Sequence, residues 1–212
     1  MLKFVLDLFF PPVCGICGKF DKNWICYNCK QKINLNKKSI VTNVYGKEYD
    51  KFIFLFSYKD IRKLILDYKF NGKSYLYNTF SKIILDDFKI CEELKKYDVI
   101  IPVPMSKKKK ARRGYNQTEL IAKCLAKELN IEYNNKSLVK IKLNKTQSTL
   151  TEKERFENVK NVFDIKNSEL VKDKKVILFD DILTTGATLD ECSKVLKKNR
   201  VNDIVVLTLA KD

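Results

Sequence analysis

The sequence predicts an α/β domain built on a parallel sheet, preceded by a small cysteine-rich module. Three observations carry this prediction. Short apolar runs alternate with segments of helical apolar spacing between residues 52 and 209. The run Val176–Phe179 is apolar without alternation, which is typical of a parallel strand buried on both faces. Four cysteines in two pairs lie within the first 30 residues. The 212 residues are enough for one domain and such a module.

The elements follow in order. Residues 1–12 are expected to form a short apolar helix that Pro11-Pro12 stops. The polar stretch 31–47 is the expected boundary between a module of residues 1–47 and a main domain of residues 48–212. Asn116 and Glu119 suggest a capping pair at the start of one helix. The main domain is predicted to contain strands at 52–58, 98–102, 176–179 and 204–209, and helices at 61–70, about 74–90, 116–129 and 188–198.

The composition limits which ligands the protein favours and which side chains can serve as acids, bases or metal ligands. Lys and Arg number 42 against 26 Asp and Glu, a net charge of +16, which favours polyanions unless it only solvates the surface. The chain has no His, so acid–base work falls to carboxylates, Lys or Tyr, and a transition metal must rely on Cys. The apolar start is too short to span a bilayer and is unlike a signal peptide, so we expect a cytoplasmic protein. Because disulfides are rare in the cytoplasm, we expect the cysteines to be metal ligands or buried thiols.

The cysteines form two knuckles, Cys14-x2-Cys17 and Cys26-x2-Cys29, eight residues apart. Such pairs can surround one tetrahedral Zn²⁺, and four protein ligands would leave no open position, so the ion would be structural. A redox-active pair and an iron–sulfur cluster stay open as alternatives. Two isolated cysteines are interpreted as small core residues on apolar helix faces, namely Cys124 and Cys192.

An apolar strand that ends in Asp180 and Asp181 leads into a loop of small and hydroxyl residues and then a helix. Backbone N–H groups at such a helix start can bind a phosphate, and the acids can accept hydrogen bonds from ribose hydroxyls. An ordinary strand–turn–helix is the alternative. The string 176–188 resembles the phosphoribosyl-pyrophosphate (PRPP) signature of type I phosphoribosyltransferases. That resemblance assigns the ribose to the two acids and the 5′-phosphate to Thr184, Thr185, Gly186, Ala187 and Thr188. Purine-base members often carry Asp where Thr184 stands, which argues against purine salvage.

A second loop follows the strand at 98–102. The resemblance implies that this loop binds pyrophosphate through Val103, Pro104, Met105 and Ser106. Residues 101–130 then hold eight Lys or Arg and two Glu, beginning with the run Lys107–Lys110. This basic segment could bind pyrophosphate or a nucleic-acid backbone, with Tyr115 stacking on a base. The alternative is a solvated lysine run in a mobile loop.

Taken together, the chain resembles the ComF (ComFC) family of bacterial competence proteins, which join a four-cysteine zinc finger to a phosphoribosyltransferase-like domain. The matching pieces run almost the full length: the segment up to Cys14 with its partner cysteines, Tyr58 followed by 66–72, Pro102-Val-Pro104 with 113–117, Gln147–Leu150 with Arg155 and Asn158, and the loop 180–188. The stretch before Gln147 is Lys-rich where the family often has Arg. Beyond the two loops, the family motif covers Lys69, Arg112, Arg113, Gly114, Tyr115, Asn116, Gln117, Arg155 and Asn158.

The resemblance implies binding of PRPP with Mg²⁺ and handling of single-stranded DNA during natural transformation, near a DNA-translocation ATPase or other competence proteins. Two alternatives remain: an active phosphoribosyltransferase on a small-molecule acceptor, and a regulator that senses PRPP without turning it over. No residue stands out as a catalytic base. As a further hypothesis, residues 147–155 form a flap that closes over the bound ligands.

Overall fold

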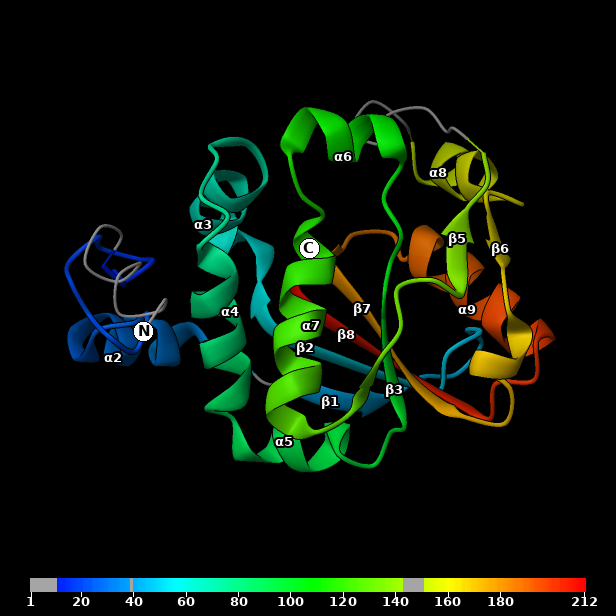
Figure 1. The fold of residues 1–212 in the computed structure, drawn as a ribbon, viewed down its shortest axis with the longest axis horizontal. Helices are drawn as coiled ribbons and strands as arrows, with labels where there is room; N and C mark the ends of the chain where they lie inside the picture. The colour runs from blue at the N-terminus through cyan, green and yellow to red at the C-terminus, as the bar shows by residue number, and fades with distance from the viewer. Residues whose placement is uncertain (1–10, 39, 143–150) are drawn as a thin grey trace, which may run out of the picture.

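A six-stranded sheet forms the centre of the protein (Figure 1). The structure is a computed structural model that describes residues 11–38, 40–142 and 151–212. The strand order is β1-β2-β8-β7-β3-β4. Residues 1–10 of the helix expected at 1–12 lie outside the described ranges. None of the described helices combines the length and apolar character that crossing a bilayer requires.

Five of the six strands run parallel, so their carboxyl ends meet at one edge of the sheet. The exception is β1 (Ile40–Asn43), which pairs antiparallel with β2. β1 lies in the polar stretch that was expected to separate module and domain, and the division at residue 47 stays a prediction. The parallel strands are β2 (Lys51–Ser57), β8 (Asp203–Lys211), β7 (Lys175–Leu183), β3 (Val99–Pro102) and β4 (Glu132–Tyr133).

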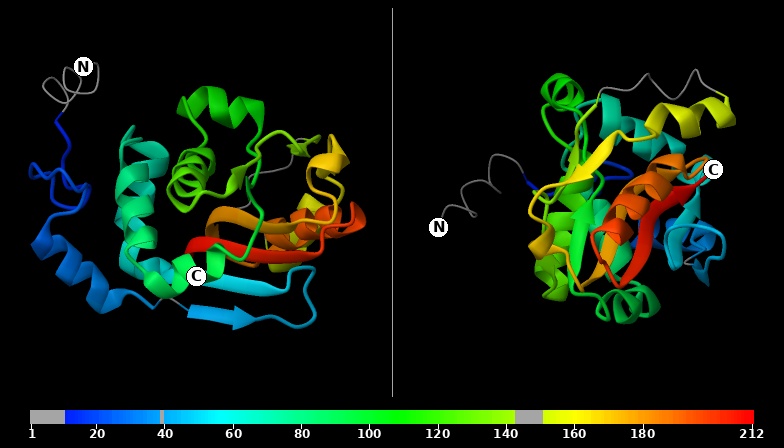
Figure 2. Two further views of the ribbon diagram at one scale, coloured as in Figure 1. Left: turned by 60° about the horizontal axis from the view of Figure 1, so that its bottom comes forward. Right: turned by 90° about the vertical axis from the view of Figure 1, so that its right-hand side faces the viewer.

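The alternation of strand side chains divides the core in two. Ile177 and Phe179 of β7 face one cluster, whereas Val176 and Leu178 face the other. The first cluster is covered by α3 (Tyr58–Phe70), α4 (Leu76–Leu85), α5 (Phe88–Leu94) and α7 (Gln117–Leu129). On the second face lie α9 (Ala187–Lys198), α8 (Glu152–Val159), the short helix Ser168–Leu170 and a separate antiparallel pair, β5 (Leu138–Lys140) with β6 (Phe163–Ile165) (Figure 2).

Several predictions at the level of elements need correction. The single helix expected at 74–90 is two helices, because Asp87 interrupts α4 and accepts a hydrogen bond from the N–H of Ile90 to begin α5. The lysine run is not a loop but helix α6 (Lys107–Arg113), which Ser106 caps and Gly114 ends with φ 84°. Asn116 does cap α7, through the N–H of Thr118. Its expected partner Glu119 pairs with Lys110 instead.

The cysteine module, which continues into α2 (Tyr27–Asn36), packs against α4. The Oγ1 of Thr79 on α4 donates to the carbonyl of Trp24, at 2.8 Å. Two ion pairs join the same surfaces, Lys30 with Asp86 at 2.6 Å and Lys37 with Asp87 at 3.0 Å. The module is therefore attached to the main core by apolar, hydrogen-bonded and ionic contacts.

The approach of the module to α4 requires glycine at position 15. A Cβ there would lie 2.3 Å from Oγ1 of Thr79 and 2.5 Å from Cδ2 of Leu76. We expect Gly15→Ala to lower the free energy of unfolding by roughly 1–3 kcal/mol, the usual cost of overpacking. Trp24, the single tryptophan, should report the displaced contact as a shifted fluorescence emission.

The control is Gly46→Ala. Gly46 has a positive φ, of 72°, which Gly15 lacks, and no atom lies within 4 Å of a Cβ added at Gly46. That variant should cost only backbone strain, about 1–2 kcal/mol, with the Trp24 emission unchanged. Equal emission spectra for Gly15→Ala and wild type would contradict the close approach.

Candidate functional site

The site lies where β3 and β7 end, at the carboxyl edge of the parallel sheet. Two adjoining cavities open there, of about 170 and 330 Å³. They share Lys69, Asp180, Asp181 and Thr188. The smaller cavity is lined by the loop from β7 to α9, and the larger one by residues 103–106 after β3. Both predicted loops and both predicted acids thus come together around one space.

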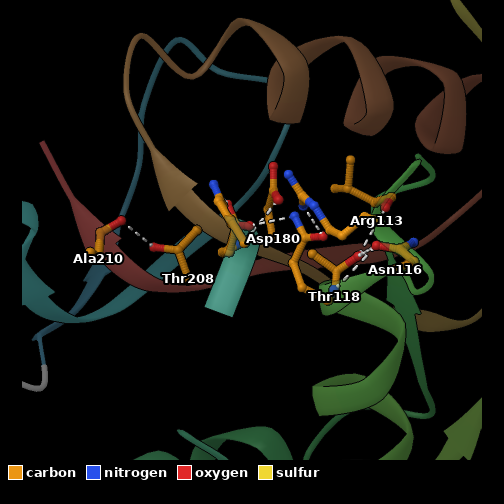
Figure 3. A network of polar contacts seen from close by, with 10 residues as sticks. Arg113, Asn116, Thr118, Asp180, Thr208 and Ala210 are labelled. Carbon is orange, nitrogen blue, oxygen red and sulfur yellow. Dashed lines mark hydrogen bonds and ion pairs between the residues drawn. The ribbon is translucent and has the colours of Figure 1, made fainter. Parts of the chain in front are cut away.

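Asp181 is the more deeply buried acid of the pair, at 4% exposed, and Asp180 is partly buried. Lys69, near the end of α3, places its Nζ 2.8 Å from Oδ1 of Asp181. The amide of Gln117, the first residue of α7, donates to Oδ2 at 2.7 Å. Arg113 in turn donates to the side-chain oxygen of Gln117. Two segments that are distant in sequence, the end of α3 and the start of α7, therefore fix the Asp181 carboxylate, within the polar network that Figure 3 shows around Asp180 and Arg113.

Asp180 is held differently. Its Oδ1 accepts a hydrogen bond from the N–H of Asp181, at 2.8 Å. Burial and the neighbouring charge of Asp181 raise the pKa of Asp180 from 3.8 to about 7, although Lys69 and Lys140 oppose the shift. The protonated form of this carboxyl therefore persists to a higher pH than that of an ordinary aspartate. A cation or a hydrogen-bond donor supplied by a ligand would favour its ionised form.

The phosphate loop begins helix α9 with Gly186 in the left-handed conformation, at φ 79°. A glycine adopts this backbone at little cost, and it offers no side chain to cap the helix. The first N–H groups of α9 carry the positive end of the helix dipole at the wall of the smaller cavity. This arrangement suits a phosphate group.

One buried donor in the larger cavity has no partner among the described residues. It is Nδ2 of Asn116, a side chain only 2% exposed. The Oδ1 of the same side chain accepts from the N–H of Thr118, which assigns the amide orientation. A buried donor without an acceptor is costly, so the hydrogen bonding of this cavity wall is incomplete at Nδ2 of Asn116.

Four cations line the larger cavity: Lys69, Lys109, Arg113 and Lys140. Burial and the charges of Arg113, Lys69 and Arg112 lower the pKa of Lys109. Burial, followed by the charge of Lys109, lowers the pKa of Lys140 to about 8. These groups repel one another, so an anion bound among them would relieve the repulsion.

Lys109 and Lys140 were missed as site residues at the sequence level. Lys109 belongs to the recognised basic run, but its placement depends on that run being a helix. Lys140 lies on β5, and the pairing of β5 with β6 brings it to the cavity beside Phe163. The Lys-rich stretch before Gln147 was the available signal for Lys140.

Other members of the family motif do not line either cavity. Tyr115 packs its ring 5.7 Å from that of Tyr68 and donates its hydroxyl to the carbonyl of Tyr68. Gly114 ends α6, and Arg112 is exposed on it. Arg155 and Asn158 lie on α8, and the proposed flap at 147–155 falls outside the described residues up to residue 150.

The four cysteines of the module form a second site. The Sγ atoms of Cys14, Cys17, Cys26 and Cys29 all lie within 4.8 Å of one another. The Sγ atoms of Cys17 and Cys26 are 3.7 Å apart. Tetrahedral zinc with bonds of about 2.3 Å places its sulfur ligands about 3.8 Å apart. The donor set and its dimensions therefore fit a tetrahedral metal ion.

The thiols of this cluster differ in acidity. Burial opposes ionisation of Cys14, but hydrogen bonds from the backbone of Cys26, Cys17 and Ile16 lower its pKa to about 7. Burial and the neighbouring thiols raise the pKa of Cys29. Of the isolated cysteines, Cys192 is fully buried, as expected, whereas Cys124 is only half-buried.

Comparison with known proteins found a family model, curated relatives and a solved structure similar to this chain. The family model for the phosphoribosyl transferase domain matches residues 116–212. Competence protein F of Haemophilus influenzae is 33% identical over 207 residues, which cover 94% of this chain and 85% of that protein. Competence protein ComFC of Bacillus subtilis is 29% identical, covering 93% and 77%. The solved adenine phosphoribosyltransferase of Thermoanaerobacter pseudethanolicus is 15% identical with a TM-score of 0.40, covering 86% and 99%.

The parallel sheet, the two loops at its carboxyl edge and the matching family model define a phosphoribosyltransferase-type domain joined to a four-cysteine module. The fold predicted from the sequence is thereby confirmed. On the identity shared with competence protein F over most of both chains, this protein belongs to the ComF/ComFC family of competence proteins.

The raised pKa of Asp180 generates a prediction for stability. Between about pH 4 and 7 the folded protein keeps a proton that the unfolded chain releases, so stability falls as the pH rises through this window. Asp180→Asn removes that loss. We expect the stability of the variant relative to wild type to increase by roughly 3 kcal/mol between pH 4.5 and pH 8.

Denaturant unfolding at the two pH values measures the difference. Titration of the cysteine cluster affects both proteins alike and therefore cancels. A difference between variant and wild type that is the same at pH 4.5 and pH 8 would contradict the assignment.

Proposed function

We propose that this protein binds PRPP with Mg²⁺ at the carboxyl edge of its sheet and handles single-stranded DNA during natural transformation, in the cytoplasm. One observation carries the proposal. A buried donor without a partner and four cations converge on a cavity beside two carboxylates and a phosphate-type loop. Such a set of groups matches a ligand with two phosphate ends and a sugar between them.

The parts of PRPP can be assigned to this set. The 5′-phosphate would bind the loop at 184–188, where α9 begins. The ribose hydroxyls would hydrogen-bond Asp180 and Asp181, whose carboxylates retain acceptor capacity beyond the bonds described above. The pyrophosphate would lie against residues 103–106, the amide of Asn116 and the four cations. Mg²⁺ prefers oxygen ligands and would be held by the pyrophosphate and the ribose side of the site, where it would favour the ionised form of Asp180.

We assign the cysteine cluster to a structural Zn²⁺. Four thiolates fill a tetrahedral coordination sphere and leave no position for a substrate. The module contacts α4 through a hydrogen bond and ion pairs. A bound Zn²⁺ would stabilise the fold of the module and thereby keep these contacts in place.

The DNA part of the proposal is supported by α6 and by the names of the relatives. Six of the seven residues of α6 are Lys or Arg, and none of them is buried. A helix with such a charge can neutralise several phosphates of a strand. The two relatives are called competence proteins, and a further relative, from Escherichia coli, is called a DNA utilization protein. A DNA-translocation ATPase or another competence protein is the proposed partner.

A second candidate function is transfer of the phosphoribosyl group to a small-molecule acceptor. The larger cavity extends past the two acids to Phe70, Val103 and Phe163, which leaves space for an acceptor beside the ribose. Dependence on DNA separates the two functions. A small-molecule enzyme would act equally well without DNA, whereas a DNA-handling protein must bind the strand.

The role of α6 is tested by Lys107→Gln/Lys108→Gln/Arg112→Gln. These three exposed residues do not line the cavities, and Gln keeps the helix propensity. Because three phosphate contacts are lost, affinity for a single-stranded oligonucleotide should fall roughly tenfold at low salt, and the slope of log K against log salt should decrease by about 2.

Fluorescence anisotropy over a salt series measures both quantities. The matched control is Lys166→Gln/Lys172→Gln/Lys175→Gln. Lys175 begins β7, and Lys166 and Lys172 lie in the segment before it, so all three are far along the chain from the carboxyl end of that strand. Equal losses for the two triple variants would show that only net charge matters and would remove α6 as the DNA-binding surface.

A further inference from the structure

Helix α3 ends with two neighbouring residues that contact different parts of the site. Lys69 pairs with Asp181 inside the cavity. Phe70 is 61% exposed, and its ring lies 5.2 Å from the guanidinium carbon of Arg113. Both residues line the larger cavity. Phe70 is therefore an aromatic surface at the mouth of the space that contains the two acids.

A single exposed phenylalanine is ordinary on a protein surface. Phe70 differs because a fixed cation adjoins it. The guanidinium of Arg113 is held by the side-chain oxygen of Gln117, which in turn donates to Asp181. The same network that orients the carboxylate thus orients the cation beside the ring. A phenyl face together with a guanidinium is a surface on which nucleobases stack.

The neighbouring charge indicates what could bring a base to this surface. Arg113 is the last residue of α6, whose other cations are exposed: Lys107, Lys108, Lys109, Lys110 and Arg112. Bases and phosphates alternate along a single strand, so a strand whose phosphates contact α6 can present a base where the helix ends. Figure 1 shows α6 at the amino-terminal end of α7, next to the end of α3.

The aromatic residue expected to stack from the sequence is not suited to this role. The ring of Tyr115 packs on Tyr68, and its hydroxyl is used by the carbonyl of Tyr68. Among the residues that the structure describes, no aromatic ring packs on Phe70, and the guanidinium of Arg113 lies over its ring. Phe70 is therefore better placed than Tyr115 to stack on a base.

We propose that Phe70 and Arg113 form a base-stacking platform at the mouth of the sugar-phosphate cavity. The platform holds one nucleobase of a single DNA strand that lies along α6, so that DNA and the sugar phosphate occupy one continuous site. The inference rests on the proposed DNA-handling function and adds to it the residue that contacts the base. It also places a base of the strand within reach of the ligand bound at Asp180 and Asp181.

The test compares two oligonucleotides with equal numbers of phosphates, oligo(dT) and an abasic strand of the same length. Stacking of one base contributes roughly a tenfold change in affinity. Phe70→Ala should therefore weaken oligo(dT) binding roughly tenfold and leave abasic binding unchanged within twofold. Phe70→Trp, with a larger aromatic face, should bind oligo(dT) at least as tightly as wild type.

The control variant is Phe88→Ala, which removes another exposed phenylalanine, 76% exposed, from α5 at the opposite end of α7 (Figure 1). It should change neither affinity. Thermal unfolding of each variant verifies that the fold is retained.

Each outcome decides between the claims. If Phe70→Ala binds oligo(dT) like wild type, or loses affinity for both strands equally, the stacking proposal is wrong, while the proposed DNA-handling function is not contradicted. If wild type binds oligo(dT) no more tightly than the abasic strand, the stacking proposal is also wrong. Wild type that binds neither strand removes the proposed DNA function and the platform with it.

Discussion

The site depends on balancing the charges of two adjacent carboxylates, Asp180 and Asp181, at the carboxyl edge of the parallel sheet. Both cannot ionise freely in a partly buried position, so their charges must be balanced. The protein balances one of them with Lys69 and Gln117 and leaves the other with a raised pKa. Lys69 and Lys140 balance the second charge in part, and a cation brought by a ligand would balance it further. A site that is incomplete in this way is suited to binding an ion together with a sugar phosphate.

The balancing groups also determine how the surrounding elements meet. Lys69 fixes the end of α3, and Gln117 fixes the start of α7, at the same carboxylate. Arg113 extends that network to α6 and to the ring of Phe70. A single buried ion pair is weak evidence for stability, because removing two charges from water is costly. Here its consequence is positional: it connects the sugar-phosphate cavity with the basic surface of α6.

Local signals made much of this predictable from the sequence. The apolar run at 176–179 and the loop at 184–188 are recognisable because strand, turn and helix chemistry follow one another within thirteen residues. The cysteine spacing indicates a metal site for the same reason. Contacts between distant segments were not predictable. β5 has three residues and is defined by its pairing with β6, so Lys140 could not be assigned to the cavity. Tyr115 and Phe70 are both aromatic residues beside basic ones, and only packing distinguishes the buried contact from the exposed face.

The central claim is that the carboxyl edge of the sheet binds a ribose phosphate through its two acids. Calorimetric titration of PRPP with Mg²⁺ into wild type and into Asp180→Asn/Asp181→Asn tests it most directly. The account predicts saturable binding to wild type, and loss of that binding in the double variant while thermal unfolding shows an intact fold. Absence of binding to wild type, or equal binding to the folded double variant, would contradict it.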